Sequence, residues 1–508
     1  MRNLRKLLLV VGLALLAPAA AFGQAETGQM NKALQAYNDG DYETSAFLLY
    51  DLAENAAAEE VRLKSEYYLA QSYFKKGLYN AALRQYSYVM QAGPNHPYYF
   101  KSVEGIINIS EVLREDFITG ALLDKEYNDD FIKLGDDYLA KVNYIVGVVS
   151  YRKNKLKSDD GAIPFLNLVT ADSSYYARAR YLLGVIYARN GENDKAIASF
   201  EDVLKLKDSL KLQYADLAEI KQLADLGLAR TYYGMGRYAD AVKHYDAIPR
   251  FSEYWDEALF ENGWARFQNE DPGGALGSLQ ALHAPQFAGS FQPESWILKA
   301  TVYYFACLYE DSKDALDYFD RIYLPINEQL KSLLDGERSN DFYYDLLAND
   351  SSKLPKSVKN YLRANHRLVQ FKNYIDQLQK EKETISSMQA WRNSRMQQDL
   401  LGNIDQSREL AIQIAGNFVK RRLDDASKTI SGFDVQKDKI KLEIGSAEEG
   451  LLELGLDQKK HLGAQAIYRP QMPGSNWEYW QFQGEFWLDE IGYYQYTLKS
   501  GCIRRENE

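Results

Sequence analysis

The stretch YLLGVIYARNGENDKAIASF, residues 181–200, has two short amphipathic segments on either side of a glycine. Small residues occur at Gly184 in the first segment and at Ala196 in the second, and Gly191 lies between the segments. A small residue lets two helices pack closely, and a glycine readily adopts the left-handed conformation that ends a helix. The large residue Phe200 follows Ala196 by four positions and so lies on the same helical face. The stretch therefore predicts two antiparallel helices joined by a tight turn.

The same pattern recurs along the first two thirds of the chain. Clear copies are YYLAQSYFKKGLYNAALRQY (67–86) and DLGLARTYYGMGRYADAVKHY (225–245). In every copy, large apolar residues follow the small residue of the second segment by four and seven positions, which predicts a buried seam with the next copy. These small residues are Ser45, Ala82, Ala162, Ala196, Ala241, Ala275 and Ala315. The steps from 162 to 196 and from 241 to 275 equal the tetratricopeptide period of about 34 residues.

These copies resemble the tetratricopeptide (TPR) family. The resemblance implies an all-α superhelical solenoid of about seven divergent repeats over residues 24–330, with an insertion near 97–142. Stacking is required because one helical pair cannot bury its own apolar face. Two copies depart from the pattern. KLKSDD (155–160) occupies the place of a short turn, and Glu270 replaces the turn glycine next to DPGG (271–274).

The resemblance also implies a partner-binding groove, because TPR proteins direct the second, fifth, ninth and twelfth side chains of each repeat into their concave face. The groove expected here is aromatic with few cations, unlike the Lys-, Arg- and Asn-rich grooves of carboxylate-clamping TPR domains. Exposed aromatic side chains commonly anchor a protein partner. The alternative is that the C-terminal half of the same chain covers Trp264 and its neighbours. The expected groove residues are Lys64, Tyr67, Gln71, Phe74, Tyr181, Arg230, Tyr233, Phe260, Trp264, Phe267 and Tyr304.

The repeat pattern is lost after about residue 351, and residues 351–460 have the character of long helices. Tyr361, Leu368 and Ile375 are seven residues apart, and Phe371, Leu378 and Ile385 form a second such series. A seven-residue apolar spacing predicts a helix packed on another helix, as in a helical hairpin or coiled coil.

Residues 465–508 are rich in aromatic side chains. Tyr494, Tyr496 and Leu498 alternate with polar residues, which predicts a strand in a small β-containing C-terminal cap. Cys307 and Cys502, the two cysteines of the chain, either form a disulfide in an oxidising compartment or remain independent thiols.

Three carboxylates, Glu485, Asp489 and Glu490, lie in this aromatic segment. A pair of carboxylates on the rigid walls of a sugar cleft would suit glycoside hydrolysis. Glu485 and Asp489 are, however, only four residues apart, and the sequence has no recognisable catalytic domain, HExxH or GxSxG motif, or phosphate loop. We therefore expect no enzyme, no catalytic residues, no cofactor and no metal site.

Composition and the first residues bear on location. The chain has 508 residues and a formal charge of −11, and this acidic balance argues against nucleic acid as a partner. Arg2, Arg5 and Lys6 precede an apolar core over 7–16, and small residues follow at 21–23. This pattern is typical of a signal peptide over residues 1–23, and no later apolar run is long enough to span a membrane.

Over nearly its whole length the chain resembles exported TPR proteins of deltaproteobacteria, of the GltE or AglT type in the gliding-motility envelope machinery. The leader, the repeats with ILKATVYYFACLYEDSKDALDYF (297–319), the charged helices and GEFWLDEIGYY (484–494) underlie this resemblance. It implies a periplasmic, outer-membrane-associated scaffold that binds envelope proteins. A peptidoglycan- or glycan-binding module is the alternative, and a murein-cleaving enzyme is the least favoured hypothesis.

Overall fold

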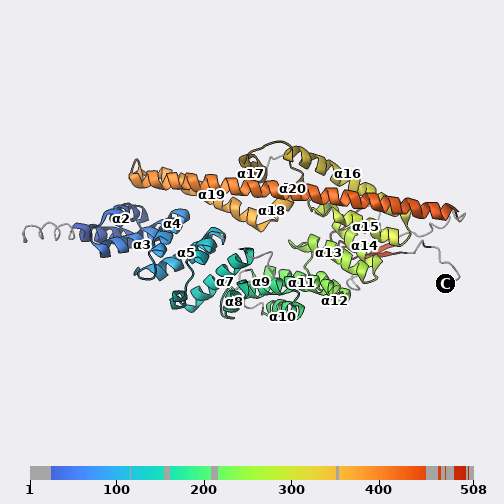
Figure 1. Cartoon of the computed structure of the whole chain (residues 1–508), viewed down its shortest axis with the longest axis horizontal. Coiled ribbons are helices and arrows are strands. Elements are labelled where there is room, and N and C mark those ends of the chain that lie inside the picture. The colour runs from blue at the N-terminus through green and yellow to red at the C-terminus, as the bar shows by residue number, and fades with distance from the viewer. Residues whose placement is uncertain are drawn as a thin grey trace, which may run out of the picture. The chain divides into compact units, whose positions relative to one another are not determined.

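The computed structural model describes residues 25–114, 116–153, 161–207, 216–349, 354–453, 467–470, 475, 485–498 and 502. The predicted signal peptide and much of the predicted cap lie outside these residues. The chain divides into two compact units, one of Met1–Ala179 with Gln370–Gln413, the other of Arg180–Val369 with Ile414–Glu508. Each unit therefore combines helical hairpins with part of the later long helices, and Figure 1 labels these elements.

The first unit is helical throughout its described residues. It begins with a helix over 25–38. The elements that follow are α2 (Tyr42–Asn55), α3 (Glu59–Lys75), α4 (Tyr79–Gln91), α5 (Tyr99–Leu113), α6 (Ile118–Glu126), η1 (Asp129–Lys133), α7 (Asp136–Lys153) and α8 (Ala162–Asn167), with most of α19 (His366–Ser387), η4 (Gln389–Trp391) and the start of α20 (Arg395–Glu453). The region of the expected insertion, 97–142, contains α5, α6, η1 and the start of α7.

The second unit continues the hairpins and adds a two-stranded sheet. Its elements are α9 (Tyr176–Arg189), α10 (Asn193–Leu204), α11 (Leu217–Gly234), α12 (Tyr238–Asp246), α13 (Trp255–Gln268), α14 (Pro272–Leu282), η3 (Pro285–Phe287), α15 (Glu294–Phe305), α16 (Tyr309–Leu334), α17 (Asn340–Ala348), α18 (Lys356–Arg363), the rest of α20, β1 (Ile467–Pro470) and β2 (Tyr494–Thr497). The fold is thus all-α with a small β element, as the sequence predicts.

One turn joins the two helices of each hairpin. In the turn between α11 and α12, the N–H of Gly236 donates to the carbonyl of Tyr233, and the next N–H, that of Arg237, donates to the carbonyl of Tyr232, both at 2.9 Å. This pair of bonds is the Schellman arrangement, which needs a left-handed residue at its centre. The same bonds recur within the described residues around the left-handed residues Gly40, Gly77, Gly191, Gly236, Glu270 and Cys307, whose φ angles lie between 56° and 82°. Glu270 and Cys307 therefore adopt the glycine conformation without being glycine.

The predicted seams are buried. Phe200 of α10 lies between two glycines, because a Cβ added at Gly184 of α9 or at Gly227 of α11 would come within 2.5 Å of its ring. Of the fourteen seam positions, Ile322 of α16 differs, being 40% exposed. α16 belongs to the last hairpin of the series, so no further repeat covers that position. The buried thirteen are Leu49, Leu52, Tyr86, Val89, Leu166, Val169, Phe200, Val203, Tyr245, Ile248, Leu279, Leu282 and Phe319.

In the first unit, α19 and the segment that follows it bind the early hairpins through polar groups. The Glu381 carboxylate, 1% exposed, accepts hydrogen bonds from the backbone N–H of Asn80 at 3.0 Å and from the Asn80 side chain at 3.0 Å. It thereby caps the N-terminus of α4, whose own cap residue, Leu78, has no side-chain oxygen. The indole Nε1 of Trp391 donates to the carbonyl of Glu43 in α2 at 3.0 Å.

The apolar series predicted in 361–385 is buried at Leu368, Phe371, Ile375, Leu378 and Ile385, and Tyr361 is partly buried. It does not lie on one continuous helix, because α18 ends at Arg363 and α19 begins at His366. The break follows from Asn365, whose side-chain oxygen accepts from the N–H of Leu368 at 3.2 Å and so caps a new helix start.

In the second unit, a buried polar cluster joins α16 to the later part of α20. Lys437, 6% exposed, donates to Asp320 at 2.7 Å and to Asp434 at 2.6 Å. Farther along α16, Asn327 donates to Ser431 at 2.9 Å and accepts from Ser427 at 2.6 Å. Buried polar groups of this kind fix the register of two helices, because a shift would leave them without partners.

β2 packs directly on α14. It pairs antiparallel with β1, with Tyr496 opposite Tyr468. A Cβ added at Gly273 would lie 2.1 Å from the carbonyl oxygen of Tyr496, and one at Gly277 would lie 1.8 Å from that of Tyr494. Gly273, in the DPGG departure, and Gly277 thus make room for the strand backbone.

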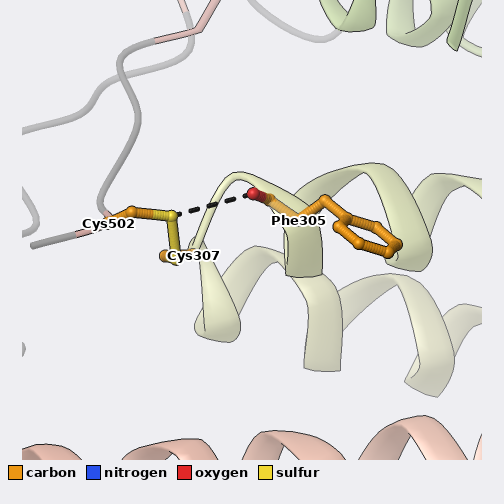
Figure 2. Close-up of a disulfide and its surroundings, with 3 residues drawn as sticks. All are labelled: Phe305, Cys307 and Cys502. Atoms are coloured by element: carbon orange, nitrogen blue, oxygen red, sulfur yellow. Dashed lines mark hydrogen bonds between the residues drawn. A yellow bond between two sulfur atoms is a disulfide. The ribbon is translucent and has the colours of Figure 1, made fainter. Parts of the chain in front are cut away.

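A disulfide joins Cys307, at the turn after α15, to Cys502, with a Cα–Cα distance of 5.0 Å (Figure 2). The sulfur of Cys502 lies 3.7 Å from the carbonyl oxygen of Phe305, which is a contact rather than a hydrogen bond because a disulfide sulfur carries no proton. The residue that occupies the turn position of the last hairpin therefore also holds the C-terminal segment.

The turn geometry predicts opposite effects of one substitution at two sites in the same unit. Gly236→Ala places a Cβ on a left-handed residue and should lower the free energy of unfolding by about 1 kcal/mol. Gly432→Ala, in the exposed middle of α20 with no atom near its Cβ, should raise it by about 0.5–1 kcal/mol. Urea unfolding followed by circular dichroism measures both values, and a change of the same sign at both glycines would contradict the turn assignment.

The disulfide predicts a second effect. It closes a loop with a sequence separation of 195, so Cys502→Ser should remove about 5 kcal/mol of stabilisation in the chain-entropy account. Cys307→Gly combined with Cys502→Ser should be more stable than Cys502→Ser alone by about 1 kcal/mol, because glycine suits the left-handed turn. Thermal unfolding compares the variants. A non-reducing peptide map of wild-type protein without a 307–502 link would refute the pairing.

Candidate partner-binding surface

The residues expected in the groove fall into both units. Lys64, Tyr67, Gln71 and Phe74 lie on α3 of the first unit, and the remaining residues lie on α9, α11, α13 and α15 of the second unit. None of them belongs to the buried core, and Arg230 is exposed. Each therefore presents part of its side chain to solvent, as the repeat positions predict.

In the first unit these residues contact a cluster of tyrosines. The Gln71 amide donates to the hydroxyl of Tyr67 at 2.7 Å, and the Tyr67 ring stacks on Tyr98 with centroids 4.7 Å apart. Burial raises the pKa of Tyr67 to about 12, so its hydroxyl stays protonated at neutral pH. Phe74 contacts Tyr79 edge-on at 5.6 Å. Contacts within the cluster therefore hold these side chains in place.

In the second unit, side chains connect the first helices of successive hairpins. Arg230 of α11 donates to Glu261 of α13 through Nε at 2.9 Å and through Nη2 at 2.8 Å, and it also contacts Glu257 at 2.8 Å. Trp264 of α13 donates its indole N–H to Glu294 of α15 at 3.1 Å. The predicted positions on α11, α13 and α15 therefore form one continuous surface.

Aromatic rings continue this surface toward the end of α15. Trp264 and Phe267 have centroids 6.2 Å apart, and Phe267 lies 5.7 Å from Phe305. Phe305 also contacts Tyr304 at 5.7 Å and is 65% exposed. We call the surface formed by Arg230, Tyr233, Glu257, Phe260, Glu261, Trp264, Phe267, Glu294, Tyr304 and Phe305 the aromatic–acidic face.

Burial changes the acidity of two carboxyl groups on this face. The pKa of Glu257 is raised by burial, an effect that the nearby Arg230 cation partly opposes. The pKa of Glu294 is also raised by burial, and the hydrogen bond from Trp264 partly opposes it. Partly buried carboxylates of this kind favour a cationic ligand, because a second hydrogen-bond donor stabilises the ionised form of each carboxylate.

Sequence reasoning missed Glu257, Glu261, Glu294 and Phe305. Glu257 precedes Phe260 by three residues, and Glu294 precedes Tyr304 by ten, so both occupy the second position of the repeat rule. Applying that rule to acidic residues as well would have found Glu257 and Glu294, whereas Glu261 lies at the sixth position, outside the rule. Phe305 follows Tyr304 directly and carries no positional signal.

The C-terminal segment and part of the aromatic–acidic face pack against the same core cluster. Tyr496 and Leu498 pack against a cluster that includes Leu279 and Leu298, and Trp264 and Phe267 pack against that cluster too. Trp264 and Phe267 nevertheless remain partly exposed.

The three carboxylates of the aromatic C-terminal segment differ in exposure. Glu490 is buried, and burial raises its pKa, whereas Glu485 and Asp489 are exposed. Within the described ranges, no three metal-ligating side chains group together. The search of the same residues for a helix long and apolar enough to cross a bilayer finds none.

Unit 1 also contains a wide cavity of about 1230 Å³ between the early hairpins and the helices α19 and α20. Arg62, Arg84 and Arg395 lie on its walls together with Glu54 and Asp399. No sequence pattern indicated it, because its lining combines residues 50–122 with residues 374–407.

A comparison with protein families matches the tetratricopeptide repeat to residues 179–213, which include α9 from Ala179 and all of α10. This match identifies a tetratricopeptide repeat in the chain. It supports the TPR assignment for the hairpins, and a helical repeat of this type indicates protein–protein interaction.

Solved structures give weaker similarities. A tetratricopeptide repeat protein from Parabacteroides merdae is 11% identical over 59% of this chain and 93% of its own, with a TM-score of 0.24. The apo form of RapI is 13% identical over 61% of this chain and 91% of its own, with a TM-score of 0.31. At these scores neither similarity carries an argument about function. No curated protein matches the sequence.

The bond between Trp264 and Glu294 predicts a pH-dependent loss of stability. This bond lowers the pKa of Glu294, so its contribution is present when the carboxylate is ionised and disappears as acid protonates it. Trp264→Phe should therefore cost about 1–2 kcal/mol at pH 7 and less below the pKa of Glu294. Phe267→Leu, which removes no hydrogen bond, should cost the same at both pH values. Urea unfolding measures both, and equal losses for Trp264→Phe at pH 7 and in acid would contradict the bond.

Proposed function

We propose that this chain is a non-catalytic scaffold that binds a protein partner on the aromatic–acidic face. The observation that carries the proposal is the continuity of half-exposed aromatic and carboxylate side chains across α11, α13 and α15. A partner segment with an apolar or aromatic anchor would pack against Trp264, Phe267 and Phe305. Aromatic side chains supply large contact area and are frequent binding hot spots.

Charge favours a basic partner segment. The face carries Glu257, Glu261 and Glu294 against Arg230 alone, and the whole chain has 71 acidic and 60 basic residues. A lysine or arginine of the partner could bind Glu294, which accepts a hydrogen bond from the Trp264 indole. Such a charge-assisted bond would also relieve the cost of burying that carboxylate.

We infer further that the protein works in the bacterial envelope after export, within the kind of periplasmic, outer-membrane-associated complex that serves gliding motility. The leader-like first residues and the resemblance to exported TPR proteins support this location. A disulfide between Cys307 and Cys502 is in keeping with an oxidising compartment. Mature protein in the periplasmic fraction should begin near Gln24, and a chain found only in the cytoplasm with Met1 retained would end the location proposal.

Partner binding predicts a specific loss on substitution. The mature chain should capture one or more envelope proteins, and Trp264→Ala with Phe267→Ala should reduce that capture at least tenfold. Capture should also weaken with salt and with acid, because protonation of Glu257 and Glu294, whose pKa values are raised, removes the charge that holds a basic segment. Quantitative mass spectrometry of crosslinked complexes measures it.

The matched control is Tyr88→Ala, which removes an aromatic side chain that is 55% exposed on α4. It should leave capture unchanged, and circular dichroism should show both variants folded. Equal capture by wild type and by the double variant would refute this face as the binding surface. Sedimentation of the chain with purified peptidoglycan, unaffected by the double variant, would instead support the glycan-binding alternative.

A further inference from the structure

The second unit contains a cavity of about 420 Å³ whose lining includes no residue of the aromatic–acidic face. Its walls come from the end of α12, the connection to α13, α13 itself, α14 and residues 492–495. A volume of this size suits a small organic ligand. The chemistry of the ligand follows from the polar atoms on the walls.

One wall holds an arginine without a carboxylate partner. The Arg250 guanidinium lies 4.6 Å from the ring centroid of Tyr493 and 5.3 Å from that of Phe251, and it donates to the carbonyl of Leu488. Its Nε is buried and has no hydrogen-bond partner within the described part of the chain. The described residues also give it no ion pair, and the rings of Tyr493 and Phe251 lie against its guanidinium.

The lining also holds a buried acceptor that no described group uses. Asn262 of α13 is 4% exposed, and its Nδ2 donates to Asp246 at 2.7 Å. Its Oδ1 is buried and accepts no hydrogen bond from any described group. A buried amide oxygen without a donor costs free energy, and a ligand that supplies a donor recovers it.

The second arginine on the walls already has carboxylate partners. Arg266 is paired with Asp246 at 2.8 Å and with Asp271 at 2.9 Å. Arg266 is thus already bound by two carboxylates, and Arg250 is the arginine of the lining for which the described residues provide no ion pair. One free cation matches one carboxylate, whereas a phosphate dianion would call for more than one.

We propose that this cavity binds a small organic carboxylate that also carries a hydrogen-bond donor. The carboxylate binds Arg250, and a hydroxyl or amide N–H of the same molecule donates to Oδ1 of Asn262. Two sources share this chemistry, a sugar acid and the carboxyl end of a short peptide. The proposal is independent of partner binding on the aromatic–acidic face, since Trp264, Phe267 and Glu294 do not line the cavity.

Calorimetric titration of the mature, disulfide-bonded chain tests the proposal with two matched pairs of probes. Glucuronate is compared with glucose, which lacks the carboxylate, and N-acetyl-alanylalanine is compared with its C-terminal amide. At least one acid should bind tenfold or more tightly than its neutral twin, and the pair that shows the difference identifies the source. No difference within either pair would overturn the proposal.

Two variants locate the site. Arg250→Gln should weaken binding of the acid at least tenfold, and Arg250→Lys, which retains the charge, should weaken it less. Asn262→Leu should weaken binding of the acid severalfold, because it removes the acceptor. Binding that is unchanged in Arg250→Gln or in Asn262→Leu would contradict the assignment.

A measurement on the unaltered protein covers the case in which Arg250→Gln does not fold. Phenylglyoxal modifies arginine side chains, and peptide mass spectrometry reports the extent of modification at Arg250. The acid that binds should lower modification of Arg250 severalfold, and its neutral twin should not. Equal modification of Arg250 with and without that acid would overturn the assignment.

Discussion

The hairpins depend on one backbone constraint, a residue held in the left-handed conformation between two helices. At that residue the chain reverses, and two backbone hydrogen bonds satisfy carbonyls that the first helix would otherwise leave without partners. Glycine meets the constraint at Gly40, Gly77, Gly191 and Gly236 without a steric cost. The reversal sets which faces of the two helices meet, so the placing of small residues against large ones follows from it.

The two turns that do not use glycine lie next to the C-terminal segment. After Glu270, the glycines of α14 admit the backbone of β2, and Cys307 forms the disulfide to Cys502. Placing a non-glycine residue in the left-handed backbone conformation costs about 1 kcal/mol, which is small against the stabilisation that a long-range disulfide provides. In the second unit the last hairpins and the C-terminal segment are therefore one structural element, which contributes α13, α14 and residues 492–495 to the walls of the cavity around Arg250.

The long helices reach the hairpins through a few buried polar groups as well as through apolar packing. Glu381 caps α4 in the first unit, and Lys437 pairs with Asp320 of α16 in the second. Both groups are almost fully buried, so a register shift would leave a charge without its partners. This explains how helices with polar, charged sequences hold defined positions against the repeats.

From the sequence by itself one could determine the helical hairpins, their turns and their seams, because each depends on residues close together in the chain. The spacing of Gly191, Ala196 and Phe200 is a local property, and burial of thirteen of fourteen seam positions follows from it. The groove positions on α11 and α13 are what the TPR resemblance implies. The division into two units that share later helices, the cap on α4 by Glu381, the docking of β2 on α14 and the cavity around Arg250 were decided by tertiary structure alone. Each of these joins residues about 100 to 300 positions apart. Such contacts produce no periodic pattern in the sequence, because their energy depends on packing and burial that only the folded chain creates.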